Sequence, residues 1–392
     1  MNPQPPTTPS RPPLVILGAS CRFAAESASR AGWAVHAADL FDDCDLAAAA
    51  VASRRVADYP DGLVAAAASF PPAPWCYTGA VENHRRVIEC VSAARPLAGN
   101  AVAEVCRVRD PLAVAELARL AGLRFPDTFH SPRGLPTDGS FLRKPLASAG
   151  GHSITPWLTT QPPDLPGFVW QRRVAGDPVS AVFCLAGVGS RLLGVSRQLV
   201  GADWCRAAPF AYAGSVSLPR VRAFLPIHEQ FERLTTVLAG HAGLRGVVGV
   251  DAIVERDGRV TVIEINPRPP ASAELAERST GAAVLERHLA AFGLRSPVPP
   301  RPVRANDTVW SKAILFTAHS LPIDEHLRER VRLLAAPWTD ADGHRAIADI
   351  PRAGQVLRAG APLLTVFGRG ESPAASTAEL RRRIEALQTI TG

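Results

Sequence analysis

Short apolar runs separated by polar turns dominate the first hundred residues. Leu14–Leu17 is one such run and ends in Gly18-Ala19-Ser20, and a helical pattern follows from Arg22 to Ala31. A second apolar run, Trp33–Ala38, ends at Asp39. Strand, turn, helix, strand and acidic residue in this order predict the start of a parallel α/β unit. One glycine in the turn is too little to indicate a dinucleotide site, so we predict a Rossmann-like domain with an ordinary turn.

Two apolar strands joined by a tight turn are the clearest local pattern in the middle of the chain. Val247–Val254 and Val260–Ile265 are apolar runs of strand length, and Arg256-Asp257-Gly258 lies between them. An Asp-Gly turn between two such runs predicts a β-hairpin. Helical patterns precede this hairpin over residues 80–122, and short β runs such as Leu363–Phe367 follow it.

The patterns predict an α/β and α+β multidomain fold. The chain has 392 residues, which is too many for one ordinary hydrophobic core. We expect a disordered, Pro-rich leader over residues 1–13 and a Rossmann-like domain over residues 14–100. A central domain would follow over residues 101–300, and a small β-rich domain over residues 301–392.

The composition argues against several classes of protein. No apolar stretch reaches the roughly 18 residues that a membrane-spanning helix needs, and the polar N-terminus is unlike a signal peptide. Seven cysteines without a Cys-x-x-Cys pair indicate neither a disulfide framework nor a zinc knuckle. We therefore expect a cytoplasmic protein with no membrane partner.

The basic residues are unusual in kind. The formal net charge is +7, yet the arginines are spread along the whole chain, so we expect no nucleic-acid partner. Only two of the 43 basic residues are lysines, Lys144 and Lys312. A lysine that persists in such an Arg-rich chain indicates a need for a compact ammonium group, which a planar guanidinium cannot replace. For Lys312, an ordinary surface position is an equally open interpretation.

Four polar residues of the predicted hairpin form the strongest candidate site. Asp251 lies in the first strand, and Glu264 and Asn266 lie two positions apart at the end of the second. Because side chains alternate along antiparallel strands, these three can share one face. Three oxygen ligands favour Mg²⁺ over zinc, and Arg268 adds a donor fork for a phosphate or oxyanion. Ordinary exposed carboxylates are the alternative, but charges inside apolar strands are costly unless they are paired or bind a metal.

Two further segments have the character of a nucleotide site. Lys144 ends a short strand and precedes a loop of small residues that contains Gly150 and Gly151. Such a loop can bring backbone N–H groups close to phosphates, and the ammonium can neutralise their oxygens. The strand that ends in Gln171-Arg172-Arg173-Val174 offers backbone partners to an adenine. An ordinary turn and a plain strand are the respective alternatives.

In this order, the three segments resemble the ATP-grasp superfamily. A lysine-bearing strand with a Gly-rich loop, a hinge strand, and an acidic hairpin that ends in Glu-x-Asn are its pattern. The chain is also similar to the predicted ATP-dependent carboligases related to biotin carboxylase, over nearly everything after residue 13. The segments that carry this second similarity include Pro74–Gly79, Arg107–Pro111, Gly176–Ser180, Gly194–Gln198, Ile265–Pro269 and Ala348–Pro351.

The resemblance implies an ATP-grasp central domain with a defined nucleotide site. The expected nucleotide contacts are Arg109, Lys144, Gly150, Gly151, Gln171, Arg172 and Val174. Lys144 would contact the ATP phosphates, the two glycines would form a mobile phosphate loop, and the last three residues would border the adenine. Two positions depart from the family pattern. Gln171 stands where an acidic residue is usual, and Arg109 is the candidate substitute for a missing second lysine.

The resemblance also implies a metal site and catalytic residues. Glu264 and Asn266 would hold Mg²⁺, with Mn²⁺ as an alternative, and Asp251 would lie on the metal or beside the reacting groups. Arg268 would act with Lys144 in catalysis and stabilise the transferring phosphoryl group or the tetrahedral oxyanion. All of these positions carry residues of the expected type.

The function implied by the resemblance is that of an ATP-dependent carboxylate–amine ligase, which acts on small molecules through an acyl phosphate. Two alternatives stay open: a carboligase that activates bicarbonate, as biotin carboxylase does, and a nucleotide-binding regulator without turnover. The expected partners are a small-molecule carboxylate and an amine, and a homodimer is left open.

Overall fold

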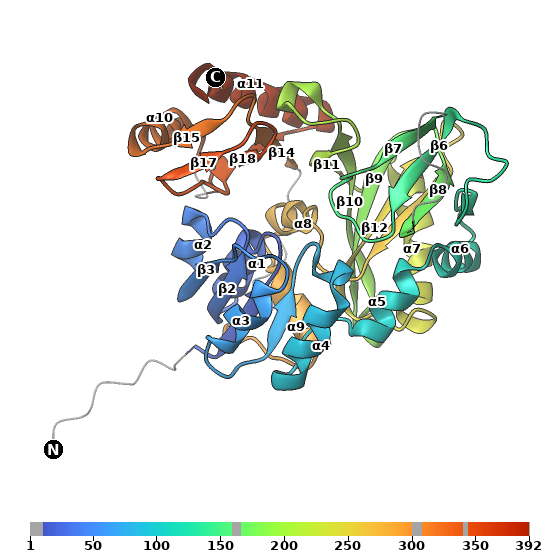
Figure 1. The fold of residues 1–392 in the computed structure, drawn as a ribbon, viewed down its shortest axis with the longest axis horizontal. Coiled ribbons are helices and arrows are strands. Elements are labelled where there is room, and N and C mark those ends of the chain that lie inside the picture. The colour runs from blue at the N-terminus through green and yellow to red at the C-terminus, as the bar shows by residue number, and fades with distance from the viewer. Residues whose placement is uncertain (1–10, 159–165, 300–307, 340–343, 392) are drawn as a thin grey trace.

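The computed structural model of the protein describes residues 11–158, 166–299, 308–339 and 344–391. The first ten residues of the predicted leader lie outside this range. Figure 1 shows the N-terminal and C-terminal elements side by side on one flank of the molecule, with helix α8 between them.

The N-terminal part is a four-stranded parallel sheet with the strand order β3-β2-β1-β4. Its strands are β1 (Pro13–Leu17), β2 (Ala34–Asp39), β3 (Ala52–Arg55) and β4 (Trp75–Tyr77), and its helices are α1 (Arg22–Arg30), α2 (Cys44–Ala49), α3 (Gly62–Ala68) and α4 (Arg85–Ala94). Leu14–Leu17 is fully buried, as expected for a parallel strand that is covered on both faces. The predicted parallel α/β unit is thus confirmed.

A small antiparallel sheet carries the predicted lysine strand and the hinge strand. Its strand order is β5-β8-β6-β7, and helices α5 and α6 precede it in the chain. The bounds are α5 (Val102–Arg109), α6 (Pro111–Leu120), β5 (Thr128–Phe129), β6 (Asp138–Pro145), β7 (Thr155–Leu158) and β8 (Phe168–Arg172). Phe141, Trp157 and Trp170 form its own small core.

An eight-stranded sheet forms the centre of the molecule, with the order β13-β12-β9-β10-β11-β14-β18-β16. Its strands are β9 (Asp177–Leu185), β10 (Arg191–Val200), β11 (Tyr212–Leu218), β12 (Gly246–Val254), β13 (Val260–Asn266), β14 (Val309–Phe316), β16 (Ile347–Ala348) and β18 (Pro362–Gly370). The predicted hairpin is the β12–β13 pair. Because β14 pairs with β11, the sheet continues through the predicted domain limit at residue 300. The domain limits themselves remain predictions.

Helices cover the central sheet on both faces. Helix α7 (Leu225–Gly240) packs against β9 and β10, and helices α8 (Ala273–Thr280) and α9 (Val284–Ala291) follow the hairpin. Helix α11 (Pro373–Thr391) packs on β14 and β18 in the C-terminal part. The remaining elements there are β15 (Leu321–Ile323), α10 (Glu325–Ala335) and β17 (Gln355–Leu357). A parallel α/β sheet joined to mixed α+β sheets is the fold class that the sequence predicts.

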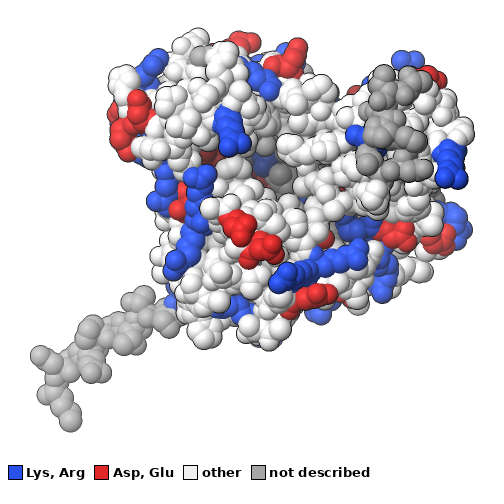
Figure 2. All heavy atoms as spheres, in the orientation of Figure 1, with Lys and Arg blue, Asp and Glu red and all other residues white. Residues whose placement is uncertain are grey.

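Two surface features bear on the expected partners. In the part of the chain that the structure describes, no helix combines the length and apolar character needed to cross a bilayer. Figure 2 shows basic and acidic side chains interspersed over one face of the molecule rather than gathered by sign. On this face, therefore, the charge pattern offers no broad basic surface for a nucleic acid.

Candidate active site

One large cavity, of about 650 Å³, lies where the N-terminal sheet, the small sheet and the central sheet meet. All eleven candidate site residues from the sequence line it: Arg109, Lys144, Gly150, Gly151, Gln171, Arg172, Val174, Asp251, Glu264, Asn266 and Arg268. These side chains come from several elements that are distant in sequence. The fold thus brings the predicted nucleotide, metal and catalytic residues to one place.

The hairpin sets three oxygen-bearing side chains next to one another. Asp251 on β12 is directly opposite Glu264 on β13, and Asn266 is opposite Gly249. The Nδ2 atom of Asn266 donates a hydrogen bond to Oδ2 of Asp251 at 2.9 Å. In an antiparallel pair, residues that lie opposite each other point to the same face. The predicted convergence of the three groups is therefore present.

The chemistry of this group fits a hard divalent cation. Asp251, Glu264 and Asn266 offer only oxygen ligands, which Mg²⁺ prefers. Within the described residues no group of three or more His, Cys, Asp or Glu side chains is arranged to hold a metal ion, so an asparagine is needed to complete the set. Burial, followed by the negative charge of Glu264, raises the pKa of Asp251 to about 6. Two crowded carboxylates of this kind favour a cation beside them.

Lys144 extends from β6 toward the hinge strand. Its Nζ atom donates to Oε1 of Gln171 at 2.9 Å, and Nε2 of Gln171 donates to the hydroxyl of Thr128 at 3.1 Å. Burial lowers the pKa of Lys144, and Glu264 opposes that effect. Gln171 thus positions the predicted phosphate-binding ammonium, which is a role that the sequence did not indicate for it.

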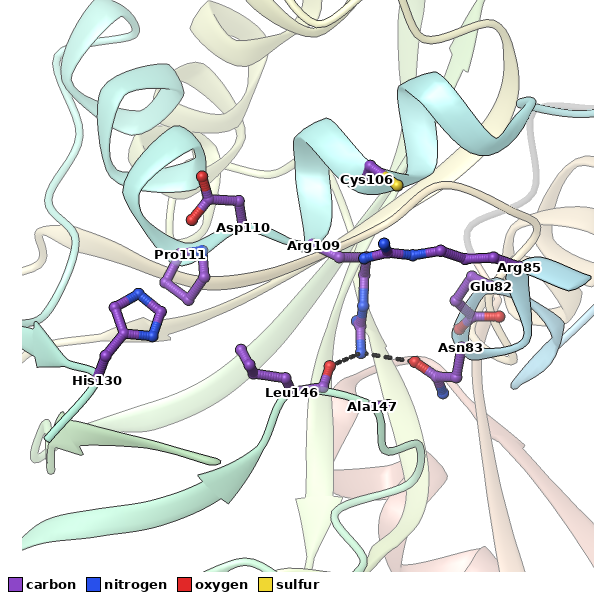
Figure 3. Close-up of a pocket in the computed structure, with 10 residues that line it drawn as sticks. All are labelled: Glu82, Asn83, Arg85, Cys106, Arg109, Asp110, Pro111, His130, Leu146 and Ala147. Atoms are coloured by element: carbon purple, nitrogen blue, oxygen red, sulfur yellow. Dashed lines mark hydrogen bonds between the residues drawn. The ribbon is translucent and has the colours of Figure 1, made fainter. Parts of the chain in front are cut away.

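Arg109 connects the candidate metal group to the loop of small residues that follows Lys144. Its Nη1 atom donates to Oε1 of Glu264, and its Nη2 atom donates to the carbonyl oxygens of Leu146 and Ser148, at 3.1 and 3.3 Å. The same Nη2 atom donates to Oδ1 of Asn83 at 2.9 Å. Figure 3 shows Arg109 reaching Leu146 and Asn83 beside a second, smaller cavity of about 250 Å³.

The charges around Glu264 keep it ionised. Burial alone would raise its pKa, but the nearby Arg109 and Lys144 lower it. Arg109 stands where we expected a second lysine, and its guanidinium pairs with Glu264, a candidate metal ligand. The guanidinium therefore partly replaces, in this structure, the positive charge that the carboxylates require.

The loop of small residues packs against the residues that lead into β11. Gly151 has a φ of 79°, and a Cβ atom added there would lie 1.9 Å from the carbonyl oxygen of Phe210. The backbone N–H of Tyr212 donates to the carbonyl oxygen of Gly150 at 3.0 Å. Only glycine fits this close approach, which explains the second glycine of the pair.

Arg268 lies at the end of the hairpin and faces the N-terminal part. Its Nη2 atom is 2.9 Å from Oε1 of Glu82, and it donates to Oδ1 of Asn266 at 3.2 Å. Glu82 is almost fully buried, so this ion pair fixes the guanidinium beside the candidate metal group. Sequence reasoning gave Glu82 no role.

A row of polar side chains continues from the hairpin across the central sheet. Gln198 on β10 donates to Oδ1 of Asp251 at 2.8 Å. Gln198 is in register with Ser215 on β11, and Ser215 is in register with Lys312 on β14. Register partners share a face, so Lys312 belongs to the same face as the candidate metal group.

Lys312 is a buried cavity residue and not an ordinary surface lysine. Only 5% of its surface is exposed, and its Nζ atom donates to Oε2 of Glu274 at 3.1 Å. The surface interpretation was therefore wrong. Arg22, Glu274 and Asp349 line the same end of the cavity. Sequence reasoning gave these three no role, because each is a single polar residue in a separate segment.

Comparison with known proteins agrees with the ATP-grasp interpretation of the central region. Residues 109–272 match the family model of the ATP-grasp domain. No curated protein sequence is similar enough to count as a match.

Several solved structures share the fold over nearly the whole chain. An N5-carboxyaminoimidazole ribonucleotide synthetase in complex with ADP is 13% identical, with a TM-score of 0.67, over 97% of each chain. An L-amino acid ligase from Bacillus licheniformis is 14% identical, with a TM-score of 0.65, over 96% of this chain and 98% of that one. The biotin carboxylase domain of Hydrogenobacter thermophilus 2-oxoglutarate carboxylase, a dimer with MgADP and bicarbonate, is 13% identical, with a TM-score of 0.64, over 90% and 85%.

At these identities the structural similarity establishes the fold, and the family model covers the segment that carries the lysine strand, the hinge and the hairpin. The ATP-grasp interpretation of the sequence is confirmed. Residues 109–272 of this chain belong to the ATP-grasp domain family.

Proposed function

We propose that this chain is an ATP-dependent carboxylate–amine ligase that acts on small molecules through an acyl phosphate. The observation that carries the proposal is the group formed by Asp251, Glu264 and Asn266, with Lys144 and Arg268 in the same cavity. Two carboxylates and an amide oxygen surrounded by cations suit a metal-bound polyphosphate.

In this proposal, Glu264 and Asn266 hold Mg²⁺, and Asp251 lies on the metal or beside it. The bound cation would neutralise charge on the phosphate oxygens of ATP. Lys144 would contact these phosphates, and the glycine pair would cover them with backbone N–H groups. Gln171, Arg172 and Val174 would border the adenine at the hinge. Arg109 would exchange its contact with Glu264 for one with a phosphate.

The chemistry then needs two displacements. A carboxylate oxygen of the first substrate bonds to the γ-phosphorus of ATP, and the bond to the bridging oxygen breaks, so ADP leaves. The amine nitrogen of the second substrate bonds to the acyl carbon, the acyl–phosphate bond breaks, and phosphate and one proton leave. Arg268 would stabilise the oxyanion that forms between these events, because its guanidinium is already fixed by Glu82.

The structural relatives support ATP-dependent carboxylate chemistry and differ in the acceptor. One is described as an L-amino acid ligase, whereas another is a biotin carboxylase domain crystallised with MgADP and bicarbonate. We favour an amine acceptor because the chain itself has no Met-Lys-Met segment for biotin, and Met1 is its only methionine. Bicarbonate activation is the alternative that the assay below separates.

The test is a screen for ADP and phosphate release. Purified full-length protein is incubated with Mg-ATP and pairs of carboxylates and amines, and separately with bicarbonate. The proposal expects ADP and phosphate to appear in equal amounts with an amide, only when both organic substrates are present. Release that needs bicarbonate and no organic carboxylate would favour the carboligase. Nucleotide binding without release under any pair would favour a regulator.

A further inference from the structure

One end of the cavity is lined by charged side chains from three parts of the chain. Arg22 begins α1, Glu274 lies on α8, Lys312 lies on β14, and Asp349 follows β16. The side chains of Arg22 and Glu274 are each 3% exposed, and that of Lys312 is 7% exposed. Charges this deeply buried must be paired with one another or with a ligand.

Arg22 has no donor left for a ligand, and Glu274, whose side chain is only 3% exposed, offers the cavity almost no surface. The Nε atom of Arg22 donates to Asp349 at 2.9 Å, Nη1 donates to Glu274 and to Glu26, and Nη2 donates to Glu274 and Asp349, at 3.0 and 3.2 Å. These five bonds use all five N–H groups of the guanidinium. Both oxygens of Glu274 are occupied by Arg22, and Lys312 adds a further bond to one of them. This pair is therefore structural.

Lys312 retains free donors. Among the described residues its ammonium has one hydrogen-bond partner, Oε2 of Glu274 at 3.1 Å. An ammonium has three N–H groups, so two remain for the cavity that Lys312 lines. A compact ammonium can direct these two donors at a ligand while it keeps its bond to Glu274, which a planar guanidinium could not do in the same space.

Asp349 retains free acceptor capacity. Each of its carboxylate oxygens accepts one bond from Arg22, and the hydroxyl of Thr365 forms a further hydrogen bond with it. Its side chain is still 27% exposed and lines the cavity. Arg22 outweighs the effect of burial and lowers the pKa of Asp349, so this group is a carboxylate at neutral pH. One cation and one anion thus remain available on either side of the same Arg22–Glu274 pair.

This charged end lies at a distance from the candidate metal group. Gln198, which touches Asp251, is in register with Ser215, and Ser215 is in register with Lys312. Two strand spacings separate Gln198 from Lys312, which corresponds to about 10 Å along the sheet. Tyr212 also lines the cavity, and its hydroxyl forms a hydrogen bond with that of Ser215, at 2.9 Å. A small molecule could therefore be held by Lys312 and Asp349 while another of its groups reaches the metal.

From these contacts we infer that Lys312 and Asp349 form a subsite for the zwitterionic end of an α-amino acid. Lys312 binds the α-carboxylate and Asp349 binds the α-ammonium. The amino acid then reacts through its side chain, which points toward Arg268 and Glu264. This inference rests on the proposed function for the identity of the reaction, but the binding site itself requires no turnover.

The first experiment measures equilibrium binding to the full chain by isothermal titration calorimetry, with Mg²⁺ and a non-hydrolysable ATP analogue present. The probes are the L-amino acids with polar or charged side chains, and for each binder the two analogues that lack the α-ammonium or the α-carboxylate. We expect at least one amino acid to bind, and each truncated analogue to bind at least tenfold more weakly. Absence of amino-acid binding, or equal affinity for the analogues, would overturn the inference.

Two variants separate a ligand contact from a general structural defect. Lys312→Met should weaken binding of the amino acid at least tenfold and leave the affinity for the analogue without a carboxylate unchanged. Asp349→Asn should also weaken binding of the amino acid, but it should leave the affinity for the analogue without an ammonium unchanged. A loss of stability alone would weaken all probes alike, so equal effects on both analogues would contradict the assignment.

Arg278→Met is the matched control. Arg278 is also a cation near Glu274, at 3.9 Å, with a side chain that is only 12% exposed, but it is not among the residues that line the cavity. Its loss should leave the affinity for the amino acid unchanged.

The binding measurements and the ADP-release assay together separate the two proposals. Amino-acid binding without ADP release would contradict the proposed ligase activity and support the subsite. ADP release with substrates that lack a zwitterion would support the ligase activity and contradict the subsite.

Discussion

Lys144 and Lys312, the only lysines of the chain, line the same cavity, one from the small sheet and the other from the central sheet. Lys144 contacts Gln171 at the hinge, and Lys312 contacts Glu274 near the N-terminal part. Seven of the 43 basic residues line this cavity among the residues that the structure describes, and both lysines are among them. The scarcity of lysine elsewhere is therefore informative about function, because a compact ammonium is retained where the cavity needs one.

Glu264→Gln should abolish turnover while the fold persists. The variant keeps the size of the side chain but removes the charge that a divalent cation needs, so we expect the rate of ADP release to fall by about 100-fold or more. Glu255→Gln is the control on the same hairpin, since Glu255 pairs with Arg124 and does not line the cavity. Near-normal activity of the Glu264 variant, with an unchanged thermal melting curve, would contradict the metal assignment.

Lys144→Ala should also abolish ADP release. Its ammonium is the group that Gln171 directs into the cavity, and alanine leaves the phosphate charge without this partner. We expect a decrease of about 100-fold or more in kcat/KM for ATP. Arg143→Ala tests the neighbouring position, where the guanidinium lies over Phe168 and outside the cavity lining. Similar losses in both variants would indicate damage to β6 rather than to a phosphate contact.

Arg109→Met should loosen the loop that follows Lys144, which we propose binds phosphate. Arg109 holds two carbonyl oxygens of this loop and also pairs with Glu264, so its loss removes several charge-assisted bonds at once. We expect the KM for ATP to rise about tenfold or more, in line with the loss of hydrogen bonds to a charged group. Hydrogen–deuterium exchange should accelerate over residues 146–151. Arg107→Met, whose guanidinium donates to Ala242, is the control and should leave this exchange rate unchanged.

The candidate site was predictable where its geometry is local. Asp251, Glu264 and Asn266 belong to two strands joined by a short turn, so alternation and antiparallel pairing alone place them together. Gly150 and Gly151 follow Lys144 within one loop, and their positive φ values agree with the role of glycine in such turns. The same reasoning predicted the first parallel α/β unit.

The remaining parts depend on contacts between distant segments, which no local pattern encodes. Arg109 and Glu264 are 155 positions apart, and Arg22 and Glu274 are 252 positions apart. The burial of Lys312 follows from the pairing of β14 with β11, which carries the central sheet beyond residue 300. Sequence periodicity indicates a strand at that point but does not reveal its neighbours.

Gly151→Ala should impair nucleotide binding more than Gly150→Ala. Both glycines have positive φ, so either alanine costs about 1 kcal/mol of backbone strain. At Gly151 the new Cβ atom would also lie 1.9 Å from the carbonyl oxygen of Phe210, whereas at Gly150 the nearest atom is 3.5 Å away, in His152. We expect a clear loss of ADP affinity for Gly151→Ala and a smaller one for Gly150→Ala. Equal affinities would show that the loop does not need its packing against Phe210 to bind nucleotide.

His288 should make the stability of the protein dependent on pH below neutrality. Its ring is buried between Val247, whose N–H donates to Nδ1, and the carbonyl oxygen of Ala98, so the folded state holds it neutral. Burial lowers its pKa to about 4, compared with roughly 6.5 in the unfolded chain. Between these values the unfolded state binds more protons, so this group destabilises the fold as the pH decreases from 7 to 5, by about 2 kcal/mol.

The measurement is urea-induced unfolding at pH 7 and pH 5 for the wild type and for His288→Gln. Other groups titrate in this range with opposite effects, for example Asp39, whose pKa burial raises to about 6. The effect of His288 is therefore the difference between wild type and His288→Gln in how much the free energy of unfolding changes from pH 7 to pH 5. The wild type should lose about 2 kcal/mol more than the variant on acidification, since glutamine binds no proton in the unfolded state. His241→Gln, at an exposed position, should behave like the wild type, and identical pH profiles for the wild type and His288→Gln would refute the buried neutral ring.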